Sequence, residues 1–367
     1  MTRRTTRRDF LRGKTAPPQH PPAGDESPPN APGSPCIDDA EAACLLQVSR
    51  SAMASDFEVC FNARQYADAA ESAIEALDRV EALEDQLSYF RPASQISRLN
   101  LVAADGPAEV EPALFELLRL SMTLWRETDG AFDITSAPLW EVWGFARREG
   151  RLPHQQAVAE ALNHVGSRYV ELNADDRTVC FTRPGVQLNL GSIGKGYALD
   201  QAAETLAHRG IRDFLFHGGQ SSVLARGSRA GGPELAAPAG WTVGVRDPLH
   251  PERRLAEIRL LDRALGTSGS TMQFFWHRGR RYSHILDPRT GQPAEGVLSV
   301  TVLAPTAALA DALSTALFVM GPQAAQEYLR PRPELAALFV CPRPDSSRVD
   351  LHAMGFLAGE LRLLDPA

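Results

Sequence analysis

Residues 188–200 read LNLGSIGKGYALD, a glycine-rich stretch with a lysine in the middle. Gly191, Gly194 and Gly196 let the backbone approach a ligand closely, and Lys195 supplies a positive charge that suits a phosphate. The preceding segment VQLNL predicts a strand, and Tyr197 to His208 has apolar side chains at helical spacing. A strand, a glycine turn and a helix point backbone N–H groups at an anion.

The two familiar phosphate-binding motifs do not fit this loop. The loop of nucleoside triphosphatases has four residues between its first glycine and the Gly-Lys pair, and a Ser or Thr follows the lysine. Here only two residues separate Gly191 from Gly194, and Gly196 follows Lys195. The GxGxxG spacing of dinucleotide-binding folds is absent too. Two interpretations stay open, an anion site of another kind or an ordinary turn with a surface lysine.

A histidine and a turn form the second candidate, YSHILDPRTGQP at 282–293. Asp-Pro followed by Thr-Gly is typical of a turn. His284 just before that turn is either a structural histidine or a general base.

The third candidate is TAALADALSTALFVMG at 306–321, where Asp311 and Thr315 are four residues apart and share a helical face. Aspartate is almost never fully buried without a partner, and oxygen ligands of this kind suit Mg²⁺. The alternative is that Asp311 faces solvent near the helix start, where the helix dipole stabilises it.

The elements that must position these residues follow from periodicity. Helices are predicted at 67–88, at 111–127 and at 307–320, the last ended by Gly321 and Pro322. Residues 48–61 predict one strand with a bend at Met53, and short strands alternate with turns beyond the glycine loop. The aromatic segment at 140–145 predicts core packing, with a ligand-stacking role as the alternative. This order predicts an α+β fold with mixed, largely antiparallel sheets and covering helices.

Composition excludes several classes of function. The chain has 367 residues and a net charge of -7, which argues against a nucleic-acid partner. Its five cysteines form no CxxC pair, so reduced thiols are expected. No segment has the length and apolar character of a transmembrane span.

The first residues differ in composition from the rest of the chain. TTRRDFLR has a twin-arginine-like start, but a Pro-rich segment follows where an export signal has an apolar stretch. We therefore expect a disordered tail at 1–44, a single domain at 45–367 and a cytoplasmic protein.

The three candidates in this order, with SYFRPASQISRLN (88–100) and DGAFDITSAPLWEVWGF (129–145), closely resemble the FAD:protein FMN transferase family. This flavinyltransferase family was once labelled as thiamine-biosynthesis lipoproteins. The resemblance covers about residues 50–330. It implies two lobes around a flavin-nucleotide cleft and a magnesium-dependent enzyme. That enzyme would transfer FMN from FAD to a Ser or Thr hydroxyl of an acceptor flavoprotein and release AMP.

The resemblance also implies roles for particular residues. His284 is the candidate for activating the incoming hydroxyl, and Lys195 and Asp311 are the other catalytic candidates. The positions that match metal ligands are Ser192, Asp311, Ser314 and Thr315. The positions that match contacts to FAD are Met53, Phe90, Ala131, Phe132, Asp133, Asn189, Gly191, Gly194, Lys195 and Ile285.

Three departures from the family pattern are visible. Asn189 stands where many members carry aspartate, and Phe90 stands where a tyrosine commonly stacks on the isoalloxazine. We also expect no working export signal or lipid anchor, although the resemblance implies a periplasmic or membrane-associated protein for much of the family. The alternatives to a transferase are an FAD pyrophosphatase that gives FMN and AMP, or a non-catalytic flavin-binding protein. The resemblance suggests acceptors such as subunits of redox-driven ion pumps or flavin-dependent reductases.

Overall fold

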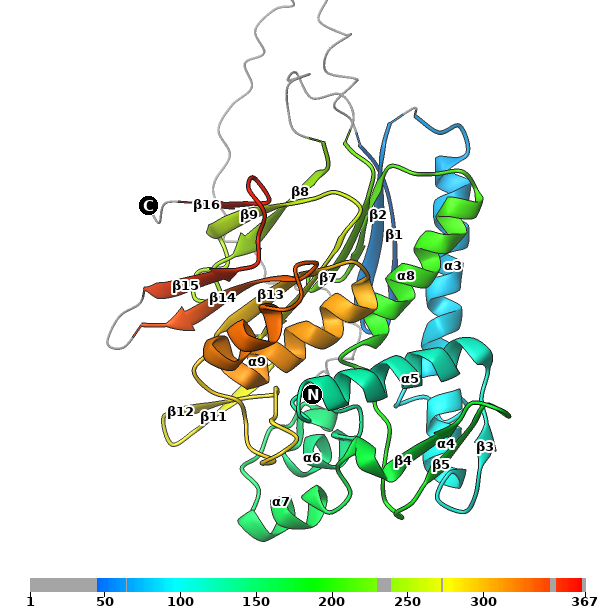
Figure 1. Cartoon of the computed structure of the whole chain (residues 1–367), viewed down its shortest axis with the longest axis vertical. Helices are drawn as coiled ribbons and strands as arrows, with labels where there is room; N and C mark the ends of the chain where they lie inside the picture. The colour runs from blue at the N-terminus through cyan, green and yellow to red at the C-terminus, as the bar shows by residue number, and fades with distance from the viewer. Residues whose placement is uncertain (1–44, 64, 230–238, 272, 344–347, 365–367) are drawn as a thin grey trace, which may run out of the picture. The chain divides into compact units, whose positions relative to one another are not determined.

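The computed structural model describes residues 45–63, 65–229, 239–271, 273–343 and 348–364, all within the unit Asp38–Ala367 (Figure 1). Its centre is an eight-stranded sheet in which every strand pair is antiparallel. In spatial order the strands are β1 (Leu45–Ala52), β2 (Ser55–Asn62), β6 (Phe214–Gly218), β7 (Ser222–Arg226), β10 (Ala264–Gly269), β13 (Ser299–Ala304), β14 (Ala336–Pro342) and β15 (Val349–Met354).

Both faces of the sheet are covered. Helices α3 (Ala69–Leu87), α8 (Gly194–His208) and α9 (Ala307–Leu329) pack on one face, and β8 (Trp241–Arg246), β9 (Arg254–Leu260) and β16 (Leu361–Leu363) form a small sheet on the other. Side chains of strand β6 contribute to the hydrophobic cores on both faces of the sheet. Phe214 and Phe216 join the helical core while Leu215 joins the core under the small sheet, because successive side chains alternate in direction.

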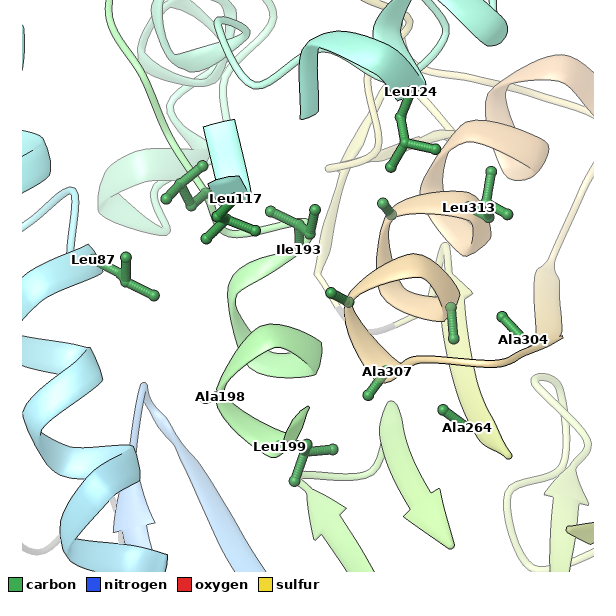
Figure 2. Packing of buried hydrophobic residues seen from close by; sticks show 14 of the residues in the cluster. Leu87, Leu117, Leu124, Ile193, Ala198, Leu199, Ala264, Ala304, Ala307 and Leu313 are labelled. Carbon is green, nitrogen blue, oxygen red and sulfur yellow. The ribbon is translucent and has the colours of Figure 1, made fainter. Parts of the chain in front are cut away.

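The remaining elements lie below α8 and α9 in the view of Figure 1. They are α4 (Gln95–Val102), α5 (Pro112–Glu127), α6 (Ala137–Val142), α7 (Gln155–Leu162), the short helices η1 (Phe145–Arg147) and η2 (Ser167–Tyr169), the sheet of β3 (Ala108–Glu109), β5 (Thr178–Phe181) and β4 (Val170–Asn173), and the hairpin of β11 (Phe274–His277) and β12 (Arg280–Ser283). Leu124 of α5 lies in the same helical core as Leu199 of α8 and Leu313 of α9 (Figure 2). No helix in the described ranges is long and apolar enough to cross a membrane.

The predicted α+β class and the three helices are confirmed. The helix that begins at Ala307 turns at Gly321, whose φ of 76° is not helical, and then continues to Leu329. The aromatic segment is core as predicted, since Trp143 and Phe145 are buried. Cys60, Cys180 and Cys341 are free thiols. The predicted tail at 1–44 lies outside the described residues, and the two lobes around a cleft stay a prediction.

Two strand predictions were wrong. Residues 48–61 form two strands rather than one, since Met53 and Ala54 make a tight turn with φ of 49° and 57°. Segment 186–190 is not a strand, because its partners lie outside any sheet: Leu188 exchanges hydrogen bonds with the side chain of Asn100, and Asn189 donates to the carbonyl of Ile134.

Two glycines let neighbouring elements approach α9 closely. A Cβ at Gly196 of α8 would lie 2.0 Å from the carbonyl oxygen of Ala307, and one at Gly266 of β10 would lie 2.3 Å from that of Ala310. Gly196 therefore serves helix packing, which differs from the ligand approach that the sequence suggested. A Cβ at Gly194 would meet only Leu190, at an ordinary 3.9 Å.

Gly196→Ala should destabilise the protein strongly, because α8 and α9 must separate to make room for the methyl group. Overpacking of this kind costs about 1–3 kcal/mol or more. Gly194→Ala is the matched control in the same helical turn and should leave stability unchanged or slightly raised. Urea denaturation of both variants measures the difference. Equal midpoints for the two would show that α8 does not press against α9.

Candidate active site

The glycine loop is held in place before α8 begins. The side-chain oxygen of Asn189 accepts a hydrogen bond from the backbone N–H of Gly191, 2.9 Å away. An aspartate would make the same turn, so the departure from the family pattern keeps the loop geometry and removes only a charge. The helix starts at Gly194, three residues earlier than predicted, which places Lys195 in its first turn.

Asp311 lies where α8, β7 and α9 meet. One carboxylate oxygen accepts a hydrogen bond from the backbone N–H of Gly196 (2.7 Å), and the other accepts one from the hydroxyl of Ser222 (2.6 Å). The side chain is buried, so the alternative of a solvent-facing aspartate near the helix start is wrong. Burial raises the pKa of Asp311 above its ordinary value, and the positive charge of Lys195 opposes that shift.

A cluster of hydroxyls lies one turn further along α9. The hydroxyl oxygen of Ser268 on β10 is 2.7 Å from that of Ser314 and 3.1 Å from that of Thr315. Ser314 also donates to the backbone carbonyl of Asp311 (2.8 Å). The spacing of Asp311 and Thr315 on one helical face thus brings a carboxylate and hydroxyls into the same region, as predicted. Ser192 makes no hydrogen bond to this cluster within the described residues.

His284 follows directly after β12 and is partly buried. Its Nδ1 lies 2.9 Å from the carbonyl oxygen of Gln273. A carbonyl can only accept, so Nδ1 carries the proton and Nε2 has a free lone pair when the ring is neutral. Burial lowers the pKa of His284, and the charge of Lys195 lowers it further, while the hydrogen bond to Gln273 raises it. The ring is therefore neutral at neutral pH.

Aromatic side chains fix the ring of His284. Trp140 and Phe145 contact it edge-on, with ring centroids 5.8 Å and 6.4 Å away. These contacts explain why the aromatic segment after Gly130 lies beside the second motif, although more than 130 positions separate the two in the chain.

The residues predicted to contact FAD differ in accessibility. Phe90 is 63% exposed and presents an open ring, whereas the hydroxyl of the adjacent Tyr89 already bonds to Glu141 and Gln187. Met53 occupies the turn between β1 and β2 in a backbone conformation that is rare for its residue type. Ile285 is buried directly after His284.

The segment Ala131 to Asp133 is buried, and the carboxylate of Asp133 points into the protein. It accepts hydrogen bonds from the backbone and hydroxyl of both Thr135 and Ser167, at 2.6 to 3.0 Å. Burial raises the pKa of Asp133, and those bonds oppose the shift. A contact from this segment to a nucleotide would therefore use the backbone, with the carboxylate holding the loop in shape.

Sequence reasoning missed three residues of this region. Ser222 and Ser268 bond to side chains of α9, and Asp200 accepts hydrogen bonds from the backbone of Ala307 and Ala308 (2.8 Å each) at the start of that helix. Burial raises the pKa of Asp200 to about 6. Ser268 could have been found, because it lies in the short polar segment TSGS (267–270) that precedes the second motif. The partners of Ser222 and Asp200 have no signal in local spacing.

The donor set fits magnesium better than a soft metal. In the described part of the chain, no three His, Cys, Asp or Glu side chains gather to hold a metal. Asp311 and the hydroxyls of Ser314 and Thr315 instead offer hard oxygen donors. Each carboxylate oxygen has accepted one hydrogen bond and has a second acceptor position left. Mg²⁺ accepts few protein ligands and keeps water or phosphate oxygens as the others.

Comparison with known proteins identifies the family of this chain. The family model described as "ApbE family" matches residues 53–339, which include all three motifs. The chain belongs to the ApbE family. Among curated relatives of this family, the FAD:protein FMN transferase of Treponema pallidum is 33% identical over 303 residues, 79% of this chain and 82% of its own. The protein of the same name from Klebsiella pneumoniae is 32% identical over 258 residues, 69% and 72% of the two chains.

Solved structures of the ApbE family have the same fold. The ApbE protein of Thermotoga maritima and the apo form of the Pseudomonas stutzeri flavinyl transferase ApbE each superpose with a TM-score of 0.73 and 28% identity. Each match covers 85% of this chain, and 97% and 95% of the two solved chains. The resemblance inferred from the motifs is thereby confirmed at the level of the family and the fold.

Proposed function

We propose that this protein transfers FMN from FAD to a Ser or Thr hydroxyl of an acceptor protein, with AMP as the leaving group and Mg²⁺ as cofactor. One observation carries the proposal: the backbone N–H of Gly196, next to Lys195, donates to Asp311 at 2.7 Å, and the charge of Lys195 lowers the pKa of both Asp311 and His284. Three motifs far apart in sequence thus supply a cation, a carboxylate and a neutral base to one region. The relatives described above are named FAD:protein FMN transferases, which supports the transfer of FMN from FAD to a protein.

The bonds exchanged define what the residues must do. The acceptor oxygen attacks the flavin-side phosphorus of FAD, the bond from that phosphorus to the bridging oxygen breaks, and the bridging oxygen leaves with AMP. Phosphoryl transfer of this kind depends on positioning and charge neutralisation more than on covalent catalysis. Lys195 in the first turn of α8 is placed to neutralise pyrophosphate oxygens.

His284 is assigned to the acceptor hydroxyl. Its Nδ1–H is held by the carbonyl of Gln273, so Nε2 takes the proton as the new bond forms. The edge contacts of Trp140 and Phe145 keep the ring in this orientation. In the family pattern a tyrosine stacks on the flavin, and Phe90 here keeps the aromatic face without the hydroxyl.

Asp311, Ser314 and Thr315 are assigned to the metal, with Ser192 as a further candidate from the loop. When bound, Mg²⁺ would stabilise the negative charge that develops on the pyrophosphate as its bond breaks. Asp311 is already fixed by Gly196 and Ser222, so its geometry is set before any ligand arrives. That preorganisation is what electrostatic catalysis requires.

Intact mass measurement of an acceptor flavoprotein subunit tests the activity. After incubation with the enzyme, FAD and Mg²⁺, the acceptor should gain the mass of FMN less one water, and AMP should appear in equal amount. Mutation of the modified Ser or Thr to Ala should abolish the gain. Free FMN and AMP with no mass gain would identify a pyrophosphatase. Flavin binding with neither product would identify a non-catalytic binding protein.

The pH dependence of transfer should report His284. The base works only when neutral, and its folded-state pKa lies below the ordinary 6.5, so the rate should fall only as pH drops through that lowered value. Lys195→Ala removes a repelling charge and should move the acid limb to higher pH, besides lowering the rate at saturating FAD. His284→Gln should remove the limb. A limb that stays in place in both variants would assign the base to another group.

A further inference from the structure

The hairpin of β11 and β12 presents an outward face that the proposed mechanism does not use. Cross-strand pairing puts Phe274 and Trp276 on one face with Arg281, while Phe275 and Tyr282 stack on the other, 5.2 Å apart. Phe274 and Trp276 are 41% and 64% exposed. Their rings contact each other edge-on, and the guanidinium of Arg281 lies 5.5 Å above the ring of Phe274.

This outward face carries positive charge in an acidic protein. Residues 274–283 contain three arginines and no Asp or Glu, whereas the whole chain has a net charge of -7. Arg280 pairs with Glu295. Arg278 at the tip and Arg281 form no ion pair with a carboxylate in the described ranges. Exposed tryptophan with arginine is the composition that protein interfaces concentrate at their energetic centres.

The base of the hairpin borders the candidate active site on both sides. The backbone N–H of His284 donates to Gln273, which closes the ladder directly below Phe274. On the outward side, Arg281 donates to the hydroxyl of Ser270, two residues beyond Ser268 and its bond to Thr315. The hairpin therefore stands directly beside His284, the group to which an acceptor hydroxyl must come.

We propose that this outward face, formed by Phe274, Trp276 and Arg281, together with Arg278 at the exposed tip of the hairpin, docks an acidic segment of the acceptor protein next to the hydroxyl that receives FMN. This proposal rests on the transferase function. Arg281 is three residues from His284 and Arg278 is five residues from Gln273. These separations are roughly 10 Å and 16 Å at the rise of an extended strand, so acidic residues of the acceptor are expected about three to five positions from its Ser or Thr. The charges of Arg278 and Arg281 favour acidic acceptors and increase the rate at which enzyme and acceptor associate.

A randomised peptide library with one fixed central threonine tests the proposal. The library is incubated with the full-length enzyme, FAD and Mg²⁺, and flavin-bearing peptides are isolated and sequenced. The wild type should enrich Asp and Glu near the threonine, and Arg278→Asp should lose that enrichment. Aspartate tolerates the left-handed conformation of Arg278 (φ 49°), so the turn persists. Trp276→Ala should raise KM for the best peptide about 2- to 5-fold, with kcat and FAD affinity unchanged.

Matched controls lie on β16, in the small sheet on the other face. Arg362 and Leu363 are also exposed, and Arg362→Asp and Leu363→Ala should leave both the enrichment and KM unchanged. Flavinylated peptides without acidic enrichment, or with enrichment that survives Arg278→Asp, would overturn the docking face while leaving the transferase intact. If no peptide gains FMN, the transferase proposal and the docking face fail together.

A membrane surface is the competing occupant, since tryptophan and arginine also bind anionic lipid headgroups. Sedimentation with phosphatidylglycerol vesicles distinguishes a membrane from an acceptor protein as the occupant of this face. Vesicle binding that Trp276→Ala abolishes, together with unchanged peptide preferences, would assign the hairpin to a membrane and contradict the proposal. Absence of vesicle binding alongside acidic enrichment would support it.

Discussion

The buried carboxylate of Asp311 is the constraint on which the candidate site depends. A charge in this position is costly unless it is paired, and its three partners come from α8 and β7. Gly196 gives a backbone N–H, Ser222 gives a hydroxyl, and Lys195 gives the opposite charge. Because Gly196 has no side chain, α8 can approach α9 closely enough to donate that hydrogen bond. The close packing of α8 against α9 and the hydrogen bond to Asp311 therefore both depend on a glycine at position 196.

Side-chain periodicity predicted the helices well and the strand ends poorly. The apolar stripes of α3, α5 and the first part of α9 each cover a buried face, and this pattern is readable from one segment alone. The turn at Met53 and Ala54 was missed, because neither residue is typical of a two-residue hairpin turn. Segment 186–190 has the composition of a strand, but the side chain of Asn100 satisfies its backbone, and no local pattern reveals a distant side chain.

The sequence predicted those residues of the candidate site that lie within the three motifs. Four-residue spacing was enough to place Thr315 on the same face as Asp311. The partners that fix the carboxylate lie 115 and 89 positions away, so only the fold brings them together. The orientation of the His284 ring likewise depends on the distant Trp140 and Phe145. Local spacing thus identified groups that could do chemistry, while tertiary packing determines how each is oriented.

The magnesium dependence of FMN transfer in Asp311→Asn tests the central role of this carboxylate most directly. Asparagine keeps an acceptor for the Gly196 N–H and nearly the same shape, so the variant should fold and melt much as the wild type does. The proposed metal site predicts that loss of this charge raises the half-saturating Mg²⁺ concentration by about tenfold or more. A variant with the wild-type magnesium dependence but a clearly lower melting temperature would contradict the account, because Asp311 would then be a structural residue alone.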